Sequence, residues 1–472
     1  MKVHRHIPFL AFLFILSQSV IHAQRNPVGS WVGTLSFGGM ELRVVFHVER
    51  VTDTSLTARL DSPDQGATGI PALPPQLKGD SVHIGVPSVL GRFTGTFVSD
   101  SVIEGTWTQG GVSLPLVLKR NSTSIVVKRP QEPKPPFPYS EREVTCRNEK
   151  DGVSIACTLT VPVGIGPFPA VVLISGSGPQ DRDETIFNHK PFLVLADHLT
   201  REGIAVLRCD DRGVGKSTGS REHATTEDFT SDVLAAVHYL KSLPEIDAGK
   251  IGLIGHSEGG LIAPLAASRS RDVAFIVLLA GPGLPGEDIL FMQGELIRRA
   301  SGTDESSIRK QAELQRRIFD IVKTETDTAR AHAAMVRAVD EFLQSLSEEE
   351  RRMPEFSRDI VHGSLRSVNT PWFRFFLTYD PRPVLRKLRI PVLALFGEKD
   401  LQVPPRENLA EVEKALREGG NTRWSAKILP GLNHLFQTAE TGNVSEYARI
   451  EETFAPAALR EISTWIRSVV GH

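Results

Sequence analysis

The residue of this chain best placed to do chemistry is a serine at the centre of a Gly-x-Ser-x-Gly pentapeptide. Ser257 is the third residue of the segment 255–259, GHSEG, and the apolar run 251–254 leads straight into it. An apolar helix start follows at Gly260. A strand, sharp turn and helix hold a serine hydroxyl at the top of a sheet, within reach of a substrate carbonyl. Glycines flank such a serine because side chains would clash in the turn. This context favours a nucleophile over an ordinary serine at a helix start.

Two further residues follow Ser257 in the order serine, acid, histidine that such a fold requires. The apolar run 390–396 predicts a buried strand, and the turn after it contains Asp400. One more strand is predicted later in the chain, and the loop after it carries His434. We expect His434 to take the proton of the serine and Asp400 to orient the imidazole. The competing interpretations are a solvated turn carboxylate, with Glu398 as the nearest rival, and an ordinary loop histidine.

Backbone amides should stabilise the oxyanion that forms when a serine attacks a carbonyl. One donor is expected from the residue after the nucleophile, Glu258. The other is expected from the loop that follows an early strand, predicted here at 169–174. That loop has the sequence SGSGP, and its alignment assigns the donor to Ser177, with Gly178 as the alternate. The simpler interpretation is a glycine-rich turn.

With these motifs, the chain resembles bacterial secreted α/β-hydrolases of the serine esterase and serine aminopeptidase-like superfamily over roughly residues 140–470. The stretches that carry the resemblance are 174–183, 209–217, 255–260 and 430–436. The resemblance implies a carboxylic-ester hydrolase that uses the three residues above. Ser175 stands where many relatives have a histidine at the head of the oxyanion loop.

Several other classes of function are disfavoured. Residues 213–217, GVGKS, look like a phosphate-binding loop, but the first glycine of that pattern is replaced by Asp210, so no nucleotide site is predicted. No His-Glu-x-x-His motif and no Cys/His cluster with ligand spacing occurs, so we expect no metal and no other cofactor. The formal net charge is −2, and positive and negative residues are well mixed along the chain. They form no basic stripe that would bind nucleic acid. The composition does not set the oligomeric state.

The first 23 residues have the pattern of a secretory signal peptide. Lys2 and Arg5 precede a short apolar core at 8–16, and Ala23 offers a small residue before the expected cleavage at Gln24. The apolar core is too short to span a membrane, so no stable membrane insertion is expected. The mature protein is predicted to be exported to the periplasm or the extracellular space.

Export permits disulfides, and the chain has three cysteines. Cys146 and Cys157 flank Asp151-Gly152, a sequence typical of a two-residue hairpin turn. Counted outward from that turn, the two cysteines face each other at about 5.5 Å between α-carbons, within disulfide range. A bridge between them and two free thiols both remain open. Cys209, at a predicted strand end, is interpreted as a small buried hydrophobe.

The hydrophobic patterns divide the remaining chain into three parts. Short alternating strands separated by Gly, Asp and Pro predict a small antiparallel all-β domain over 27–128, as a sandwich or small barrel. A proline-rich, extended linker follows at 129–140. Residues 141–472 alternate strands and helices, which predicts an α/β-hydrolase domain with a mostly parallel sheet. No catalytic constellation occurs in the β-domain. It could bind a ligand, dock on the hydrolase domain or shape the mouth of its site, and a packing accessory is the simplest interpretation.

The α/β alternation is interrupted at about 285–385 by charged helical patterns, where a lid would be inserted. An aromatic patch at its end, Trp372 to Tyr379, could line a substrate pocket or attach the lid to the sheet. The predicted substrate is a carboxylic ester of small to medium size, cleaved through an acyl-enzyme on Ser257. A lid favours some selectivity for the acyl chain or the alcohol, but its composition does not set the size of the substrate.

Two alternatives to the esterase remain open. A serine aminopeptidase would need a buried acid for the substrate amine, and Glu295, Asp320 and Glu341 are among the candidates in the lid. A non-catalytic binding protein on a hydrolase fold would be favoured by a missing triad member. All three triad positions are filled in this chain.

Overall fold

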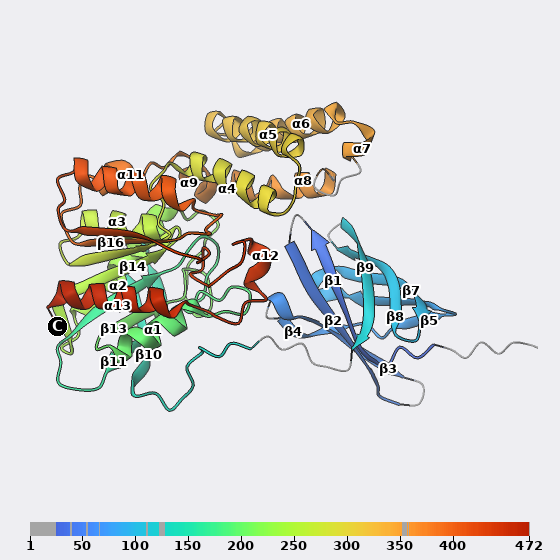
Figure 1. Ribbon diagram of the computed structural model, residues 1–472, viewed down its shortest axis with the longest axis horizontal. Coiled ribbons are helices and arrows are strands. Elements are labelled where there is room, and N and C mark those ends of the chain that lie inside the picture. The colour runs from blue at the N-terminus through green and yellow to red at the C-terminus, as the bar shows by residue number, and fades with distance from the viewer. Residues whose placement is uncertain are drawn as a thin grey trace, which may run out of the picture.

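A computed structural model of the chain describes residues 25–37, 40–52, 55–65, 67–109, 112–121, 128–351, 356 and 358–471. The predicted signal peptide lies outside the described residues. Two sheets organise the chain, each with its own apolar core, and Figure 1 shows them side by side.

The N-terminal domain is one nine-stranded antiparallel sheet with the order β4-β3-β2-β1-β9-β8-β7-β6-β5. It curls around a single core that contains Trp31, Phe46, Phe93 and Trp107. The sheet approaches closure, since the amide of Leu73 donates to the carbonyl of Gly85 at 2.7 Å. The predicted all-β domain is therefore confirmed, as a barrel-like sheet. Its strands are β1 (Gly29–Phe37), β2 (Met40–Arg50), β3 (Leu56–Ser62), β4 (Ala67–Ala72), β5 (Gln76–Lys78), β6 (Ser81–Val86), β7 (Gly91–Ser99), β8 (Val102–Gln109) and β9 (Val112–Asn121).

The second sheet has eight strands in the order β10-β11-β13-β12-β14-β15-β16-β17. From β13 onward the neighbours are parallel, and β10 and β11 add an antiparallel edge. The central strands are buried along almost their whole length, as a sheet covered on both faces requires. The strands are β10 (Tyr139–Asn148), β11 (Val153–Pro162), β12 (Phe168–Ile174), β13 (Ala205–Cys209), β14 (Ile246–His256), β15 (Phe275–Leu279), β16 (Val392–Gly397) and β17 (Trp424–Leu429).

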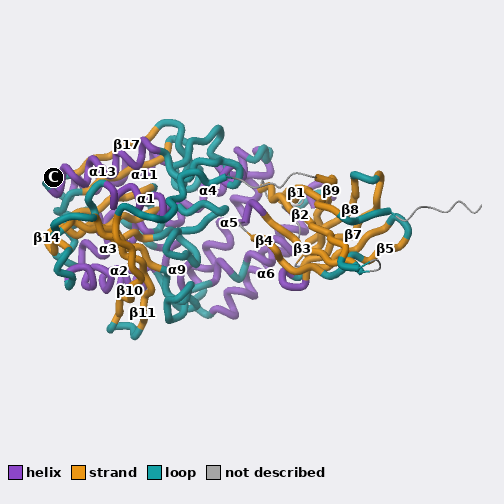
Figure 2. Tube along the Cα trace, turned by 90° about the horizontal axis from the view of Figure 1, so that it is seen from below, coloured by secondary structure: helices purple, strands orange, loops and turns teal. Residues whose placement is uncertain are grey.

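Helices cover both faces of this sheet. In Figure 1, α3 and α11 lie above the strands and α1 and α13 below them, and Figure 2 shows the same layers from a second direction. The predicted α/β-hydrolase fold with a mostly parallel sheet is confirmed. The covering helices are α1 (Pro191–Arg201), α2 (Thr226–Lys241), α3 (Gly259–Arg269), α11 (Pro405–Glu418) and α13 (Pro456–Val470). The short helix α12 (Val444–Tyr447) lies at the junction with the β-domain, where it contacts β2.

A helical insertion separates β15 from β16, where the sequence predicts a lid. Its helices have their own core, in which Phe319, Phe342 and Phe373 take part. Figure 1 shows α5 and α6 forming its outermost layer. The helices are α4 (Gly286–Ala300), α5 (Glu305–Thr324), α6 (Thr328–Ser345), α7 (Glu348–Arg351), α8 (Arg358–Ser364), α9 (Pro371–Thr378) and α10 (Arg382–Leu385).

The proline-rich segment is not a free spacer, because its polar side chains bind the hydrolase domain. Arg129 donates to the carbonyls of Ile450 at 2.8 Å and Ala448 at 3.2 Å. Gln131 accepts from the amide of Thr453 at 2.6 Å. Nearby, Arg449 forms an ion pair with Glu41 of β2, which joins the two domains directly.

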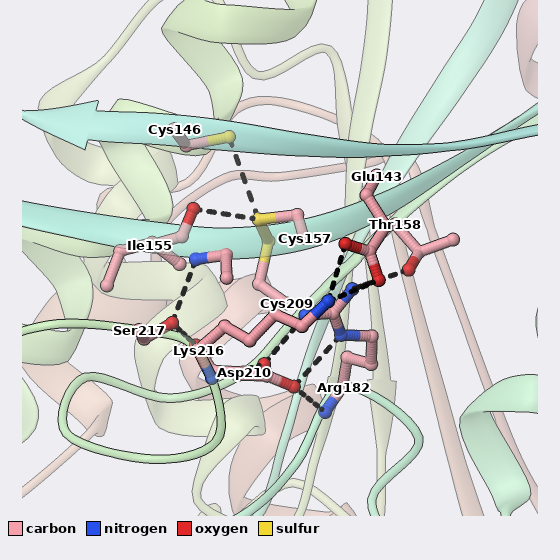
Figure 3. Close-up of a disulfide and its surroundings, with 11 residues drawn as sticks. Glu143, Cys146, Ile155, Cys157, Thr158, Arg182, Cys209, Asp210, Lys216 and Ser217 are labelled. Carbon is pink, nitrogen blue, oxygen red and sulfur yellow. Dashed lines mark hydrogen bonds and ion pairs between the residues drawn. A yellow bond between two sulfur atoms is a disulfide. The ribbon is translucent and has the colours of Figure 1, made fainter.

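The cysteine pairing differs from both interpretations of the sequence. The disulfide joins Cys157 to Cys209, which face each other on β11 and β13, and Cys146 is a free buried thiol (Figure 3). The interpretation of Cys209 as an unbonded hydrophobe is therefore wrong. The hairpin loop has four residues rather than two, so Cys146 faces Ile155 and not Cys157. A slip of two residues keeps Cys146 on the same face of the sheet, and its Sγ lies 3.7 Å from that of Cys157.

The segment that looks like a phosphate-binding loop is a structural turn. The carboxylate of Asp210, in place of the missing glycine, accepts from the amide of Lys216 at 3.1 Å. The Lys216 side chain points to Glu143 of β10 and forms an ion pair at 2.7 Å (Figure 3).

Candidate active site

Ser257 lies in a strained turn between β14 and α3. Its φ of 52° is left-handed, a conformation that costs a residue with a side chain about 1–3 kcal/mol. The turn is held because the Ser257 amide donates to the carbonyl of Leu279, on the neighbouring strand β15, at 2.9 Å. The side chain of Ser257 is only half-buried, whereas both residues next to it are buried.

The flanking glycines are required by close backbone contacts. A Cβ on Gly255 would lie 2.0 Å from the carbonyl oxygen of Gly259, and one on Gly259 would lie 2.2 Å from that of Ile174. A Cβ on Gly260 would lie 2.4 Å from the α-carbon of Gly281. The turn is therefore pressed between the ends of β12 and β15, which explains the spacing seen in the sequence.

Asp400 and His434 meet at the same edge of the sheet. Asp400 follows β16 and His434 follows β17, and the Nδ1 of His434 lies 2.8 Å from the Oδ2 of Asp400. Both side chains are almost fully buried, with exposed fractions of 0% for Asp400 and 5% for His434. The other oxygen of Asp400 accepts from the amides of Gln402 and Val403. The carboxylate is thus fixed on both oxygens, and it orients the imidazole through Nδ1.

Glu398, the rival acid, lies elsewhere. It is exposed and accepts from the amide of Gly431 at 2.9 Å, so it supports the start of the histidine loop rather than the imidazole. The loop is also shaped by Asn433, whose side-chain oxygen accepts from the amides of Leu435 and Gln437. A Cβ on Gly397 would lie 2.4 Å from the carbonyl oxygen of Asn433, so the acid strand and the histidine loop are in close backbone contact.

The structure brings Ser257 and His434 to one edge without joining them directly. Their described side chains form no hydrogen bond with each other. The two residues are nevertheless close, because His256 directly precedes Ser257 and its ring centroid lies 4.8 Å from that of His434. A loose serine–histidine contact is common before substrate binds, since these hydrogen bonds tighten in the reacting complex.

The predicted oxyanion loop lies against the nucleophile. A Cβ on Gly176 would be only 3.2 Å from the Cβ of Ser257, so the residue before Ser177 touches the serine. The amide of Gly176 is already used, since it donates to Glu184 at 2.7 Å. Among the described residues, the amides of Ser177 and Glu258 have no main-chain or side-chain acceptor. These two N–H groups are therefore available to a substrate oxygen.

A buried histidine–glutamate pair behind the nucleophile is not predicted from the sequence. His256 Nδ1 lies 2.9 Å from Glu184 Oε1, and its Nε2 lies 3.0 Å from the carbonyl oxygen of His434. Burial lowers the pKa of His256, the Glu184 carboxylate raises it, and the net pKa lies above the ordinary value. Because the same Glu184 oxygen accepts from Gly176, this pair connects the oxyanion loop to the histidine loop. The signal in the sequence was the histidine inside the GHSEG motif.

The side chain of Glu258 connects the nucleophile turn to the helical insertion. Its Oε1 accepts from the hydroxyl of Thr226 and from the indole N–H of Trp372 on α9, both at 2.7 Å. The carboxylate is buried, and burial raises its pKa. Part of the aromatic patch therefore attaches the insertion to the sheet. Phe373, the next residue, lies in the core of the insertion itself.

A further acid, which is half-buried, supports the oxyanion loop. Asp211 accepts from the Ser175 hydroxyl at 2.8 Å and from the Gln180 amide at 3.0 Å, and it pairs with Arg221 at 2.7 Å. Burial raises the pKa of Asp211 to about 6. Ser175, in the position of the relatives' histidine, is thus a structural residue of this loop.

No described helix has both the length and the apolar character needed to cross a membrane. In the described part of the chain, the one group of side chains close enough to share a metal ion is Cys146, Cys157 and Cys209. Two of these sulfurs are bonded to each other, which leaves a single thiol.

The fold and the arrangement at the sheet edge define a serine hydrolase of the α/β-hydrolase class. The model of the family described as serine aminopeptidase, S33, matches residues 190–440, more than half of the chain. The chain therefore belongs to the serine aminopeptidase S33 family.

Similar proteins include named esterases. The chain is 27% identical to esterase EstD of Thermotoga maritima over 306 residues, which is 65% of this chain and 62% of EstD. The match thus covers less than two thirds of EstD. An uncharacterized 31.7 kDa protein of Escherichia coli is 24% identical over 54% of this chain and 81% of its own length. Among solved structures, the Pyrococcus furiosus esterase Pf2001 is 15% identical with a TM-score of 0.40, covering 70% of this chain and 93% of its own.

Proposed function

We propose that this protein cleaves carboxylic esters of small to medium size through an acyl-enzyme on Ser257. The observation that carries the proposal is the placement of three groups at one sheet edge: a serine on a left-handed turn, a buried histidine–aspartate pair, and two available amides. The similarity to EstD, which is named an esterase, favours esters over peptides.

The reaction follows from the geometry. His434 takes the proton of the Ser257 hydroxyl as its oxygen attacks the ester carbonyl, and Asp400 stabilises the imidazolium through Nδ1. The amides of Ser177 and Glu258 donate to the oxyanion. The ester C–O bond breaks, and the alcohol leaves with the proton from His434. Water, deprotonated by His434, then attacks the acyl-enzyme, which releases the acid and restores Ser257.

The aminopeptidase alternative is not favoured by the acids that the sequence suggested. Glu295, Asp320 and Glu341 are all exposed on the helical insertion, and Asp320 and Glu341 lie in surface ion pairs with Lys323 and Arg317. None of the three forms a buried site for a substrate amine. We further propose, from the sequence of residues 1–23, that the protein is exported.

The test is hydrolysis of p-nitrophenyl acetate, butyrate and decanoate beside an aminoacyl p-nitroanilide, with the mature protein and Ser257→Ala. We expect ester turnover, with kcat reduced about 10⁶-fold in the variant, to background. Ser268→Ala, on the same helix α3, is the matched control and should retain full activity. Preferential cleavage of the anilide would replace the esterase with an aminopeptidase. Ester turnover that survives in Ser257→Ala would refute the proposed nucleophile.

A further inference from the structure

The helical insertion contains a cavity of about 370 Å³. This volume falls within the range of about 300–1,000 Å³ found for small-molecule sites. Its walls are mostly apolar, with Phe319, Phe342, Phe356 and Phe373 among them. Neither Ser257 nor His434 lines it, so it is distinct from the site described above.

One charged side chain interrupts the apolar wall. Arg298 of α4 lines the cavity, and its Nη1 is buried without a hydrogen-bond partner among the described residues. Burial lowers the pKa of Arg298, and among the described residues the charge that acts against this is that of Glu295, one helical turn earlier and exposed. A buried guanidinium N–H without an acceptor is destabilising, and an anion would remove that cost.

The guanidinium of Arg298 fits in this position because residue 294, one turn earlier on α4, has no side chain. A Cβ on Gly294 would lie 2.7 Å from Nη1 of Arg298 and 3.2 Å from Oε1 of Gln315. Gln315 also lines the cavity and donates to the carbonyl of Leu290 at 3.1 Å. The charged group is therefore lodged between α4 and α5, in a wall whose other polar side chains, Gln311 and Gln315, are uncharged.

We propose that this cavity binds a monocarboxylate with an unbranched apolar chain, a medium-chain fatty acid, with the carboxylate paired to Arg298. A planar carboxylate matches the donors of a guanidinium. The hydrocarbon chain of the fatty acid would pack against the phenylalanines, whose side chains form no hydrogen bonds that it would have to displace. The site stands independently of the proposed esterase activity, because its residues and those at the sheet edge do not overlap.

The test is titration calorimetry of the full mature protein with decanoate, below the concentration at which decanoate aggregates, and with 1-decanol as the uncharged probe. We expect decanoate to bind, and Arg298→Met to weaken its binding by at least about ten-fold while leaving that of decanol unchanged. Arg299→Met is the matched control, since Arg299 is exposed on the same helix and pairs with Glu305. It should bind decanoate as the unmodified protein does.

Thermal unfolding separates a binding defect from a folding defect. Without ligand, Arg298→Met should melt at or above the midpoint of the unmodified protein, because the substitution removes an unpartnered N–H from the interior. Decanoate should raise the midpoint of the unmodified protein and not that of the variant. Equal binding of decanoate by both proteins, or equal loss in Arg299→Met, would overturn the proposal.

Decanoate could also bind as a product at Ser257, and a third arm distinguishes the two sites. Protein sulfonylated at Ser257 with phenylmethylsulfonyl fluoride should still bind decanoate in an Arg298-dependent way. Loss of binding on sulfonylation would place decanoate at the sheet edge and refute the separate site. If Ser257 does not react, the esterase proposal is weakened, while the Arg298 comparison still decides the cavity.

Discussion

The carboxyl edge of the sheet and the helical insertion are built in opposite ways. At the edge, glycines touch backbone atoms, and both oxygens of the buried acid Asp400 are hydrogen-bonded. In the insertion, the apolar faces of charged helices surround a cavity of about 370 Å³, and Arg298 has a buried N–H without a partner among the described residues. The edge therefore fixes one geometry for a reaction, whereas the insertion leaves space for an adaptable ligand.

The largest loss of activity in this comparison is expected from a change in the histidine–aspartate pair at the sheet edge. Asp400→Asn keeps the shape of the side chain but removes the charge that stabilises the imidazolium and fixes its tautomer. We expect kcat to fall about 10³–10⁴-fold with little change in KM. Steady-state hydrolysis of p-nitrophenyl butyrate measures this. Glu398→Gln, on the same turn, should lose less than about three-fold, and a comparable loss there would mean that the acid is misassigned.

The half-buried Asp211, which supports the oxyanion loop, should make stability depend on pH. The pKa of Asp211 rises from 3.8 to about 6 on folding, so the native state holds its proton more tightly than the unfolded chain does. The resulting stability is fully present below pH 3.8 and is lost as the pH rises through about 6, an effect of about 3 kcal/mol. Asp211→Asn has no such titration.

The difference in thermal midpoint between the two proteins, measured from pH 4 to pH 7, checks this prediction. The unmodified protein should lose stability relative to Asp211→Asn across that window. A difference that does not change with pH would show that Asp211 titrates normally. Asp272→Asn, which removes the surface partner of Lys241, is the matched substitution of an acid by its amide outside the oxyanion loop.

The sequence predicted the regular part of the molecule well. Strands such as β15 and β16 are continuous apolar runs, and the order serine, acid, histidine predicted that the loops after β14, β16 and β17 meet at one edge. The disulfide was not predictable, because it depends on the pairing of β11 with β13, whose cysteines are 52 residues apart in the sequence. The length of the hairpin loop decides only whether Cys146 faces Cys157. The pair of His256 and Glu184 was also missed, since it joins residues 72 positions apart through an unusual left-handed backbone at Glu184. Amphipathic patterns predicted the helices of the insertion but not the space between them, which depends on packing angles.

Glu184 should affect the reaction by positioning other groups. Its Oε1 holds the amide of Gly176 and the ring of His256, but it does not line the path of the reaction. Glu184→Ala should lower kcat about ten-fold with KM nearly unchanged, because a shifted oxyanion loop weakens only the transition state. Glu184→Gln retains an acceptor oxygen and should recover most of the loss. Equal rates for the alanine variant and the unmodified protein would assign Glu184 a purely structural role.

The smallest effects of single substitutions are expected where the two regions meet, at the two donors to Glu258. Trp372→Phe removes the hydrogen bond from α9, and Thr226→Val removes the one from α2. Each substitution alone should cost about 1 kcal/mol of stability, because the buried carboxylate keeps one donor. Together they should cost more than the sum, by about 0.5–3 kcal/mol, because the carboxylate then has neither. Thermal unfolding of the four proteins measures this coupling.

Strict additivity would mean that the two donors act independently and that the insertion is not attached to the edge through Glu258. A superadditive loss, with kcat changed less than about three-fold in Trp372→Phe, would show that this contact stabilises the junction without taking part in the reaction.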